Sequence, residues 1–361
     1  MRINVTKSFL PPQKEYEYYL SKIWDTNWLT NNGPLVVELE EKLKNFLSIP
    51  HFIFVNNGTI AIQLLLKAFE LKGEVITTPF SYCATTTSVL WENLTPVFVD
   101  VKESDLNINP DLIEEKISDK TTAILATHVY GHPCEIEKIE AIAKKYSLKV
   151  IYDAAHAFGV KYKGKSLLAY GDASTCSFHS TKVFHTIEGG SITCNNLKLF
   201  EKLKLLRSFG HVLDEYYLPG INGKNSEFHA AMGLVNLNHL SEIIAGRKNI
   251  FSIYDQNLNW KNLKKPKSFT EDYEYNYAYY PIILESEAIT LKVISQLNKE
   301  HIFPRRYFYP SLNKLPYLKN SDSCLVSEDI SKRVLSIPLY PDLELPIVDK
   351  IIEIINQSIG I

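Results

Sequence analysis

Lys182 stands in a chain segment that otherwise carries no charge. It belongs to the stretch CSFHSTKVFHTIEGG, residues 176–190, and no charged residue occurs from Ala173 to Thr181. A lysine in a low-charge, partly desolvated site has a depressed pKa, and its amine can form a Schiff base with a carbonyl compound. Taken alone, however, Lys182 is better explained as a surface residue on a turn.

A carboxylate follows an apolar run in KVIYDAAHAFG, residues 149–159. Asp153 ends this run, and His156 follows it within the same motif. An ionised carboxylate at the end of a buried strand needs a partner, because an unpaired buried charge is costly. A role for Asp153 as the cap of the next helix explains the motif equally well.

A turn from strand to helix is predicted in NNGTIAI, residues 56–62, where Gly58 and Thr59 open the helix. Free backbone N–H groups and the helix dipole attract anions at such an end, and the Thr59 hydroxyl is a further donor. An ordinary helix cap accounts for the same residues. Each of these features, taken separately, therefore has a structural alternative.

Short apolar runs alternate with helical segments through the first two thirds of the chain. This alternation is typical of βαβ units and of a mainly parallel sheet. In such a sheet ligands collect outside the carboxyl ends of the strands, which is where the features above lie. The predicted strand segments are residues 51–58, 74–79, 96–101, 121–131 and 149–155, and the predicted helices are residues 59–71, 83–92, 110–117 and 135–147.

The pattern changes after a helix predicted to start near Asn225 and to end near Phe251. The 361 residues, 45% of them apolar, can bury a full core, and their number suggests more than one unit. We predict a large α/β domain over residues 1–251 and a smaller α+β domain over residues 252–361. The N-terminal segment is expected to pack on the smaller domain.

Composition and charge exclude several classes of function. The net charge is −2 and no long basic cluster occurs, which argues against nucleic-acid binding. No apolar stretch reaches membrane-spanning length, and the N-terminus lacks the apolar core of a signal peptide. We therefore expect a soluble, cytoplasmic protein.

The cysteines and histidines give no sign of a metal site. The five cysteines are widely spread and form no CxxC pair, which predicts reduced, buried thiols. His128 and His132 have no carboxylate or cysteine partner at a standard interval, so no bound metal is expected.

The helix start, the aspartate and the lysine together match one cofactor better than they match separate structural roles. Pyridoxal phosphate needs an anchor for its phosphate, an acid partner for its ring nitrogen and an amine for its aldehyde. The chain offers them in that order at Gly58, Asp153 and Lys182. No GxGxxG fingerprint follows the first strand, which argues against an NAD-dependent sugar enzyme.

The same motifs resemble a known family, the DegT-type, pyridoxal-phosphate-dependent aminotransferases that act on nucleotide-linked keto-sugars. The resemblance covers nearly the whole chain and implies the fold type I, aspartate-aminotransferase-like architecture, with three layers around a mainly parallel sheet. The motifs that carry it are WLTNNGP, NNGT, TTPFSYCAT, THVYGHPC, YDAAHAFG, SFHSTKVFHTIEGG and GINGKNSEFHAAMG.

The resemblance implies a role for each motif residue. Lys182 would form the Schiff base with the cofactor and move the proton, and Asp153 would keep the pyridine nitrogen protonated. The phosphate would be bound by Gly58, Thr59 and Ser177, with Asn222 reaching across from a second subunit, so the functional unit would be a homodimer with shared active sites.

Two ring-bearing residues would complete the cofactor site. Tyr82 stands where the family has an aromatic ring stacked on the cofactor, and His156 where a polar side chain contacts the ring's phenolic oxygen. For Tyr82 the alternative is core packing beneath the helix, and for His156 it is a satisfied core histidine.

The nucleotide-sugar would contact polar and aromatic residues near the edges of the predicted site. Such side chains suit a pyrophosphate or a base, although a surface or packing role explains each of them as well. The candidates are Asn27, Trp28, Thr30, Lys224, Arg306 and Tyr307.

Within the family, the motifs are most similar to the branch that aminates dTDP-4-keto-6-deoxy-D-glucose at C4 with L-glutamate as donor, for a surface glycan such as O-antigen. The branch that aminates C3 usually has glycine before the lysine and Asn-Leu-Gly after it, where this chain has Thr181 and Val183-Phe184-His185. Dehydratases of this fold have a histidine in place of the lysine, so the presence of Lys182 argues against dehydratase activity. A regulatory protein that binds pyridoxal phosphate or a nucleotide-sugar without turnover is the alternative of another class.

Overall fold

A seven-stranded mixed sheet forms the centre of the molecule, in the order β2-β10-β9-β6-β5-β3-β4. The computed structural model describes residues 2–318 and 322–360. All neighbouring strands are parallel except that β10 runs antiparallel to β2 and β9. The strands are β2 (His51–Val55), β3 (Glu74–Thr77), β4 (Thr95–Phe98), β5 (Thr121–Thr127), β6 (Lys149–Asp153), β9 (Ala173–Ser177) and β10 (Gly190–Cys194). The predicted mainly parallel α/β sheet is confirmed.

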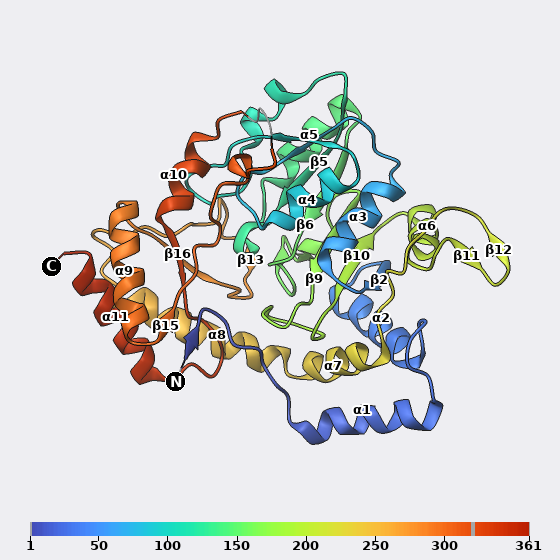
Figure 1. Ribbon diagram of the computed structural model, residues 1–361, viewed down its shortest axis with the longest axis horizontal. Coiled ribbons are helices and arrows are strands. Elements are labelled where there is room, and N and C mark those ends of the chain that lie inside the picture. Colours follow the sequence, from blue (N-terminus) through green and yellow to red (C-terminus); the bar gives the residue numbers. More distant parts are fainter. Residues whose placement is uncertain (1, 319–321, 361) are drawn as a thin grey trace.

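Both faces of this sheet are buried, because successive side chains along a strand point to opposite faces. In β2, Phe52 and Phe54 enter one hydrophobic core, whereas Ile53 and Val55 enter the other. Helices cover both faces and complete three layers (Figure 1). The first core includes side chains of α1 (Gln13–Thr26), α2 (Pro34–Leu47), α5 (Ile136–Tyr146) and α7 (Glu227–Asn238), and the second includes those of α3 (Gly58–Ala68), α4 (Cys83–Trp91) and α6 (Leu197–Arg207).

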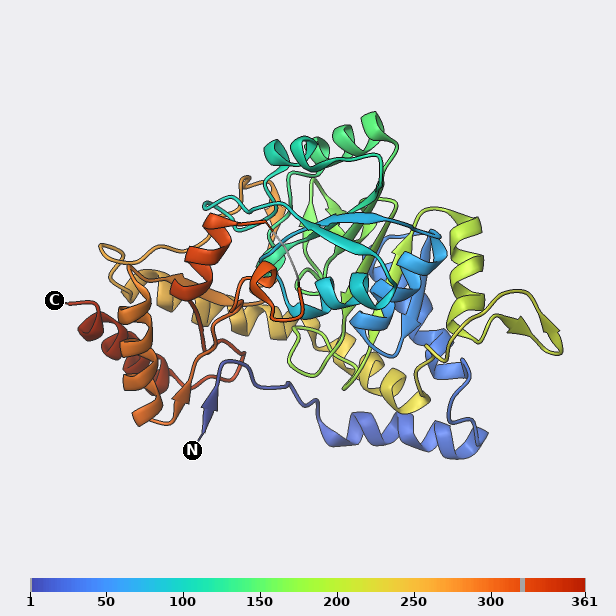
Figure 2. The ribbon, with the colours of Figure 1, turned by 45° about the horizontal axis from the view of Figure 1, so that its top comes forward.

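A further hydrophobic core lies at one end of the molecule, beside both chain termini (Figures 1 and 2). The short strand β1 (Ile3–Asn4) pairs there with β15 (Ile302–Phe303), so the N-terminal segment packs on the C-terminal part of the chain. The predicted boundary after residue 251 falls inside α8 (Leu240–Asn257), a helix that contributes to two cores. The other elements of this region are β14 (Tyr280–Ile283), α9 (Glu287–Lys299), α10 (Leu325–Arg333), β16 (Val334–Ile337) and α11 (Leu345–Ser358).

Two predicted helices differ from those observed. Residues 110–117 form two short 3-10 turns, η1 (Pro110–Leu112) and η2 (Glu114–Lys116), since so short a segment gains few α-helical hydrogen bonds. The single helix predicted from Asn225 to Phe251 is two helices, α7 and α8, which separate at His239. At this break the His239 ring lies 2.9 Å from a carboxylate oxygen of Glu15 in α1.

Short paired strands lie at the edges of the molecule. A hairpin of β11 (His211–Val212) and β12 (Glu215–Tyr216) projects at the end opposite the chain termini (Figure 1). A small sheet joins β13 (Tyr273–Glu274), β7 (Lys161–Tyr162) and β8 (Lys165–Ser166). Within the described residues, no helix is long and apolar enough to cross a membrane. All five cysteines are free thiols, and four of them are buried.

Candidate active site

The carboxyl ends of the parallel strands open into a cavity of about 320 Å³. The sheet supplies Asp153 at the end of β6, Ser177 at the end of β9, and Gly58 just after β2. Lys182 enters from the loop between β9 and β10. The lining also includes Thr59, Ser81, Tyr82, His156, His179, Glu188, Tyr279, Arg305, Tyr307 and Phe308.

The start of α3 forms a cradle for an anion. Asn57 caps this helix by accepting a hydrogen bond from the Ile60 amide at 2.8 Å, which leaves the amides of Gly58 and Thr59 at the open end. A side chain at position 58 would come within 3.0 Å of the Ser177 Cβ, so glycine lets the two segments approach closely. The Ser177 hydroxyl and the helix N-terminus can therefore face the same anion.

Asp153 is a buried carboxylate with its own hydrogen-bond donors. Its Oδ2 accepts from the Thr85 hydroxyl at 2.8 Å, and its Oδ1 accepts from the Ala155 amide at 3.1 Å. Burial raises the pKa of Asp153, and Thr85, Ala155 and Lys182 oppose that rise. Each oxygen retains a lone pair for a further donor, which a protonated ring nitrogen would supply. The alternative of a mere helix cap does not account for the cavity in front of this carboxylate.

A chain of hydroxyls supports Asp153 from the side of α4. Thr85 contacts the Ser81 hydroxyl at 2.8 Å, and Ser81 in turn accepts from Thr127 at 3.2 Å. Sequence reasoning did not single out these residues. Their hydroxyls meet only because β3, β5 and β6 are neighbours in the sheet. A buried network of this kind fixes the orientation of the carboxylate it serves.

The Lys182 amine lies inside the cavity and donates to the Tyr279 hydroxyl at 3.3 Å. Burial lowers the pKa of Lys182, but Tyr279, Asp153 and Cys176 raise it, and the net direction is upward. The expectation of a depressed pKa is therefore wrong, because Tyr279 and Asp153, which are distant in sequence, favour the ammonium together with Cys176. Position in the cavity, rather than an uncharged local sequence, sets Lys182 apart from the surface lysines.

The loop that carries Lys182 is closed at its base by hydrogen bonds. The Phe178 amide donates to the Gly189 carbonyl at 2.7 Å, and the Thr186 amide donates to the Phe178 carbonyl at 2.9 Å. Across the loop, His179 Nε2 lies 3.6 Å from a carboxylate oxygen of Glu188. The loop is thus a turn whose two ends are anchored to each other.

The two predicted ring contacts differ in burial. His156 is buried, accepts at Nδ1 from the Tyr130 amide at 3.2 Å, and stacks on Phe308 with 5.5 Å between ring centroids. Desolvation lowers the pKa of His156 well below its usual value, so the ring is neutral. Tyr82 lines the cavity with 60% of its surface exposed, which excludes the alternative of core packing.

Residues 305–312, here called the arm, bring the C-terminal part of the chain to the cavity. Tyr307, predicted as a substrate contact, lines the cavity, as do Arg305 and Phe308. Arg306 lies outside the lining and pairs with Glu287 at 3.0 Å. Arg306, predicted as a substrate contact together with Tyr307, therefore does not line the cavity, whereas its neighbour Arg305, which the sequence did not single out, does.

The arm is fixed by partners from both parts of the molecule. Arg305 pairs with Ser336 of β16 through two backbone hydrogen bonds of 3.0 and 2.8 Å. The Tyr130 hydroxyl donates to the Tyr307 carbonyl. The Leu312 amide donates to the Pro79 carbonyl at 2.7 Å.

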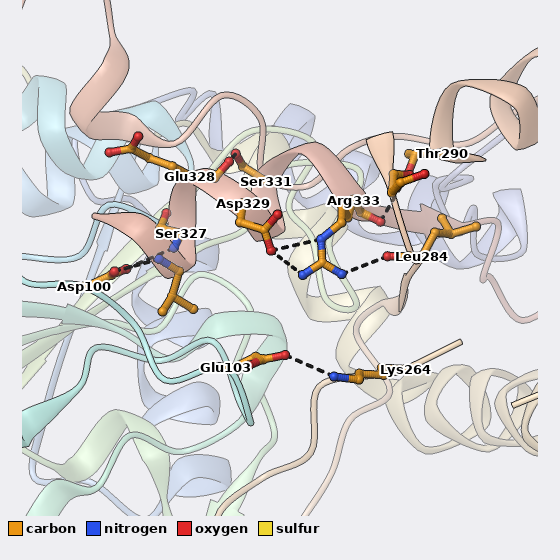
Figure 3. Close-up of polar contacts among 12 residues, drawn as sticks. Asp100, Glu103, Lys264, Leu284, Thr290, Ser327, Glu328, Asp329, Ser331 and Arg333 are labelled. Carbon is orange, nitrogen blue, oxygen red and sulfur yellow. Dashed lines mark hydrogen bonds and ion pairs between the residues drawn. The ribbon is translucent and has the colours of Figure 1, made fainter. Parts of the chain in front are cut away.

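Asp100, which follows β4, ties the helix before β16 to the large sheet (Figure 3). Its carboxylate accepts from the Val326 amide at 2.8 Å and from the Ser327 amide at 3.0 Å, at the start of α10. The Val101 amide donates to the same carboxylate at 2.8 Å. Since α10 leads directly into β16, this cap positions the strand that holds Arg305.

The remaining predicted residues lie outside this chain's own cavity. Asn27, Trp28 and Thr30 belong to the exposed connection between α1 and α2. Asn222 is exposed and bridges to Ser208, and Lys224 lies over the Phe209 ring at 4.6 Å. Their assigned roles stay predictions, and for Asn222 a position outside the cavity is what a contribution to a second subunit requires.

The residues present fit pyridoxal phosphate. The glycine cradle at α3 suits the phosphate, and the buried Asp153 has lone pairs for a ring N–H. Lys182 is the one lysine among the described residues that line the cavity. No cluster of three or more His, Cys, Asp or Glu side chains suited to a metal ion occurs within the described part of the chain.

Comparisons with known proteins agree with this reading. The model of the DegT/DnrJ/EryC1/StrS aminotransferase family matches residues 12–356. The chain is 42% identical to a dTDP-4-amino-4,6-dideoxy-D-glucose transaminase of Shigella dysenteriae, with 98% of each chain covered. It is 41% identical to a protein of the same name from Escherichia coli, again over 98% of each chain.

The fold is likewise shared with solved structures. The crystal structure of DesI in the presence of its TDP-sugar product matches with a TM-score of 0.93 and 28% identity, covering 99% of this chain and 93% of that one. The family match covers residues 12–356, and all residues that line the cavity fall within this range. The chain belongs to the DegT/DnrJ/EryC1/StrS family and is a pyridoxal-phosphate-dependent sugar aminotransferase of fold type I.

Proposed function

We propose that this aminotransferase moves the amino group of L-glutamate to C4 of dTDP-4-keto-6-deoxy-D-glucose, giving dTDP-4-amino-4,6-dideoxy-D-glucose. The observation that carries the proposal is the 42% identity, along 98% of both chains, to a transaminase named for that product. Supporting it, Lys182 and Asp153 line one cavity together with the anion cradle at Gly58.

Lys182 is the proton carrier in this proposal. When bound, pyridoxal phosphate holds the amino group between the two substrates and accepts the electron pair left as the donor's C–H bond breaks. The Lys182 amine takes the proton from that donor carbon, and the Tyr279 hydroxyl 3.3 Å away orients the amine. In the second half the same amine delivers a proton to the sugar carbon and so sets its stereochemistry.

Asp153 keeps the ring nitrogen protonated. A carboxylate inside a low-dielectric site stabilises a nearby cation more strongly than it does in water. Thr85 and the Ala155 amide hold the carboxylate in place before any ligand arrives, so no reorganisation is needed during the reaction. The amides of Gly58 and Thr59 and the Ser177 hydroxyl would hold the cofactor's phosphate.

A second copy of the chain completes the site in this proposal. Asn222 and the loop residues Asn27, Trp28 and Thr30 lie outside their own cavity and are exposed, as residues that reach a partner's site must be. The nearby hairpin exposes Phe209, Tyr216 and Tyr217, which suits an interface between subunits. The dimer acts in the cytoplasm, where its amino-sugar product supplies surface glycan synthesis.

Product analysis tests the substrate assignment. The protein is incubated with pyridoxal phosphate, L-glutamate and dTDP-4-keto-6-deoxy-D-glucose, and the position of nitrogen in the product is found by NMR. We expect nitrogen on C4 and an equimolar yield of 2-oxoglutarate. If only the 3-keto isomer were turned over, the site of amination would be C3 and not C4. If the protein bound the cofactor but turned over no keto-sugar, a regulatory role would be favoured.

A further inference from the structure

We propose that Arg247 is a positioning residue of the active site, whose guanidinium holds the backbone beside Tyr279 and so keeps the Tyr279 hydroxyl against the Lys182 amine. Arg247 lies on α8, is 2% exposed and is among the largest fully buried side chains of the described residues. The inference deepens the proposed function, since it rests on Lys182 as the proton carrier.

Arg247 is a buried cation without a carboxylate partner. Among the described residues, no carboxylate lies within ion-pair distance of its guanidinium, whereas the similarly buried Arg207 pairs with Glu40 at 2.6 Å. Its Nε atom has no hydrogen-bond partner within the described part of the chain, and burial lowers its pKa to about 10. A buried charge is costly unless other groups compensate it, so the acceptors that Arg247 does have deserve a functional explanation.

Those acceptors are two successive backbone carbonyls. Arg247 Nη1 donates to the Ala278 carbonyl at 2.9 Å and to the Tyr277 carbonyl at 3.2 Å. Both carbonyls belong to the turn between β13 and β14. Tyr277 has a φ of 54° there, in the left-handed region that a bulky residue seldom adopts. The charge-assisted hydrogen bonds of Arg247 thus stabilise an unfavourable turn from the side of α8.

Tyr279 follows this turn directly and reaches the active-site cavity. It is buried, it lines the cavity, and its hydroxyl accepts a hydrogen bond from Lys182 Nζ at 3.3 Å. The planar peptide bond from Ala278 to Tyr279 couples the direction of the Ala278 carbonyl to the backbone that carries the tyrosine. A guanidinium that fixes this carbonyl therefore also fixes the direction in which Tyr279 points.

Asn276 holds the other side of the same turn. Its side-chain amide donates to the carbonyls of His156 and Phe158, each at 2.9 Å, and its Oδ1 accepts from the Ala278 amide at 3.0 Å. The turn is thus clamped between the segment that follows β6 and the helix α8. Removal of the Arg247 guanidinium leaves Asn276 in place and frees only the side that faces α8.

A double-mutant cycle of Arg247→Gln and Tyr279→Phe tests the proposal, because residues that act through one contact give non-additive effects. The first readout is the pKa of Lys182 in the cofactor-free protein, followed by NMR of isotope-labelled lysine, with the Lys182 signal identified by its absence from Lys182→Ala. The second is the rate of the glutamate half-reaction in the loaded protein.

The matched control is Tyr254→Phe. Tyr254 is also buried on α8, and its hydroxyl donates to the Pro338 carbonyl at 2.9 Å, outside the cavity. The control therefore removes a buried contact from the same helix to a backbone carbonyl without touching the turn before Tyr279. Thermal unfolding of every variant measures the loss of stability.

Both single variants should lower the pKa of Lys182, because Tyr279 raises it, whereas Asp153 and Cys176 face the amine in every variant. Arg247→Gln should slow the glutamate half-reaction by about 10²-fold, the cost of a reacting group displaced by about 1 Å. The double variant should be no slower than Tyr279→Phe alone, and Arg247→Lys should recover part of the loss. Tyr254→Phe should lower the unfolding temperature and leave both readouts unchanged.

Two results would overturn the proposal. One is a folded Arg247→Gln whose Lys182 pKa and half-reaction rate match those of Tyr254→Phe. The other is full additivity of the losses from Arg247→Gln and Tyr279→Phe, since the two residues would then act independently. If Arg247→Gln does not fold, Arg247→Lys completes the cycle under the same two criteria. Failure of the wild type to react contradicts the proposed function instead, and the lysine pKa in the cofactor-free protein still decides the role of Arg247.

Discussion

Two regions meet at the cavity, and they are positioned by different means. The strand-end region, with Asp153, Ser177 and the Lys182 loop, is held by the sheet and by hydrogen bonds between short loops at its edge. The arm, with Arg305 and Tyr307, is held by β16 and by large-domain groups far away in sequence. In the proposed function, the first region would supply the groups that carry out the chemistry, and the second would form a wall beside the bound substrate.

We expect substitutions in the strand-end region to stop the reaction, and substitutions in the supports of the arm to change stability and substrate binding. Lys182→Ala should have the largest effect on turnover. We expect at least a ~10⁴-fold loss of turnover because the proton carrier is gone, with the fold intact. Steady-state rates and circular dichroism measure both effects, and a variant that retained full transamination would remove Lys182 from its role.

Asp153→Asn should slow both half-reactions by about 10²- to 10³-fold, since a neutral amide no longer favours the protonated ring nitrogen. The control is Asp172→Asn, near the other end of β6, where the carboxylate accepts from the Val150 amide at 2.9 Å. Single-turnover kinetics should show the loss only at position 153. Equal rates for the two variants would mean that Asp153 has a purely structural role.

The strand-end residues were largely predictable, because short motifs at the ends of apolar runs mark them. Gly58, Asp153 and Lys182 were found in this way, Ser177 was implied by the family resemblance, and the sheet topology explains why they converge. Their chemical roles remain predictions that the variants above test.

The arm could not be predicted in the same way. Nor does any motif mark Tyr279, just before β14, whose hydroxyl accepts a hydrogen bond from the Lys182 amine. Which of two adjacent arginines faces the cavity depends on the pairing of Arg305 with Ser336, a contact between remote segments. Local sequence also gave the wrong direction for the pKa of Lys182, since its neighbours in space come from other elements.

Asp100→Ala tests whether α10 supports the arm. Three backbone amides lose their acceptor, so the free energy of unfolding should fall by about 2 kcal/mol, at the upper end of a lost helix cap. The Michaelis constants should rise more than the turnover number falls, because β16 and the arm that lines the cavity shift together.

The control for this variant lies beside it in Figure 3. Glu103→Gln breaks an exposed ion pair with Lys264, 3.2 Å long, between the same two parts of the molecule. Exposed pairs contribute little, so urea unfolding should be nearly unchanged. If Asp100→Ala left both stability and the Michaelis constants unchanged, α10 would not be the support of the arm.

The pH dependence of stability tests the strand-end region in a milder way. His128 follows β5, its amide donates to the Asp153 carbonyl at 3.0 Å, and burial lowers the pKa of its imidazole to about 3. The unfolded chain binds a proton on this histidine near pH 6.5, whereas the folded protein does not. The contribution of neutral His128 to the free energy of unfolding is therefore fully present above pH 6.5 and is lost as the pH falls toward 3.

His128→Gln should remove this loss. Between pH 6 and pH 5, wild-type stability should fall by about 1.4 kcal/mol per pH unit more than that of the variant. Urea unfolding at several pH values provides the measurement. Parallel curves for the two proteins would show that His128 is protonated in the folded state and that its surroundings are not dry.

The most direct measurement of the central claim is the visible absorption of the cofactor-loaded protein during sequential addition of both substrates. We predict that L-glutamate removes the visible band, that dTDP-4-keto-6-deoxy-D-glucose restores it, and that Lys182→Ala shows neither change at a comparable rate. A band that glutamate leaves untouched, or one that Lys182→Ala cycles as fast as the wild type, would contradict the assignment of both half-reactions to this cavity.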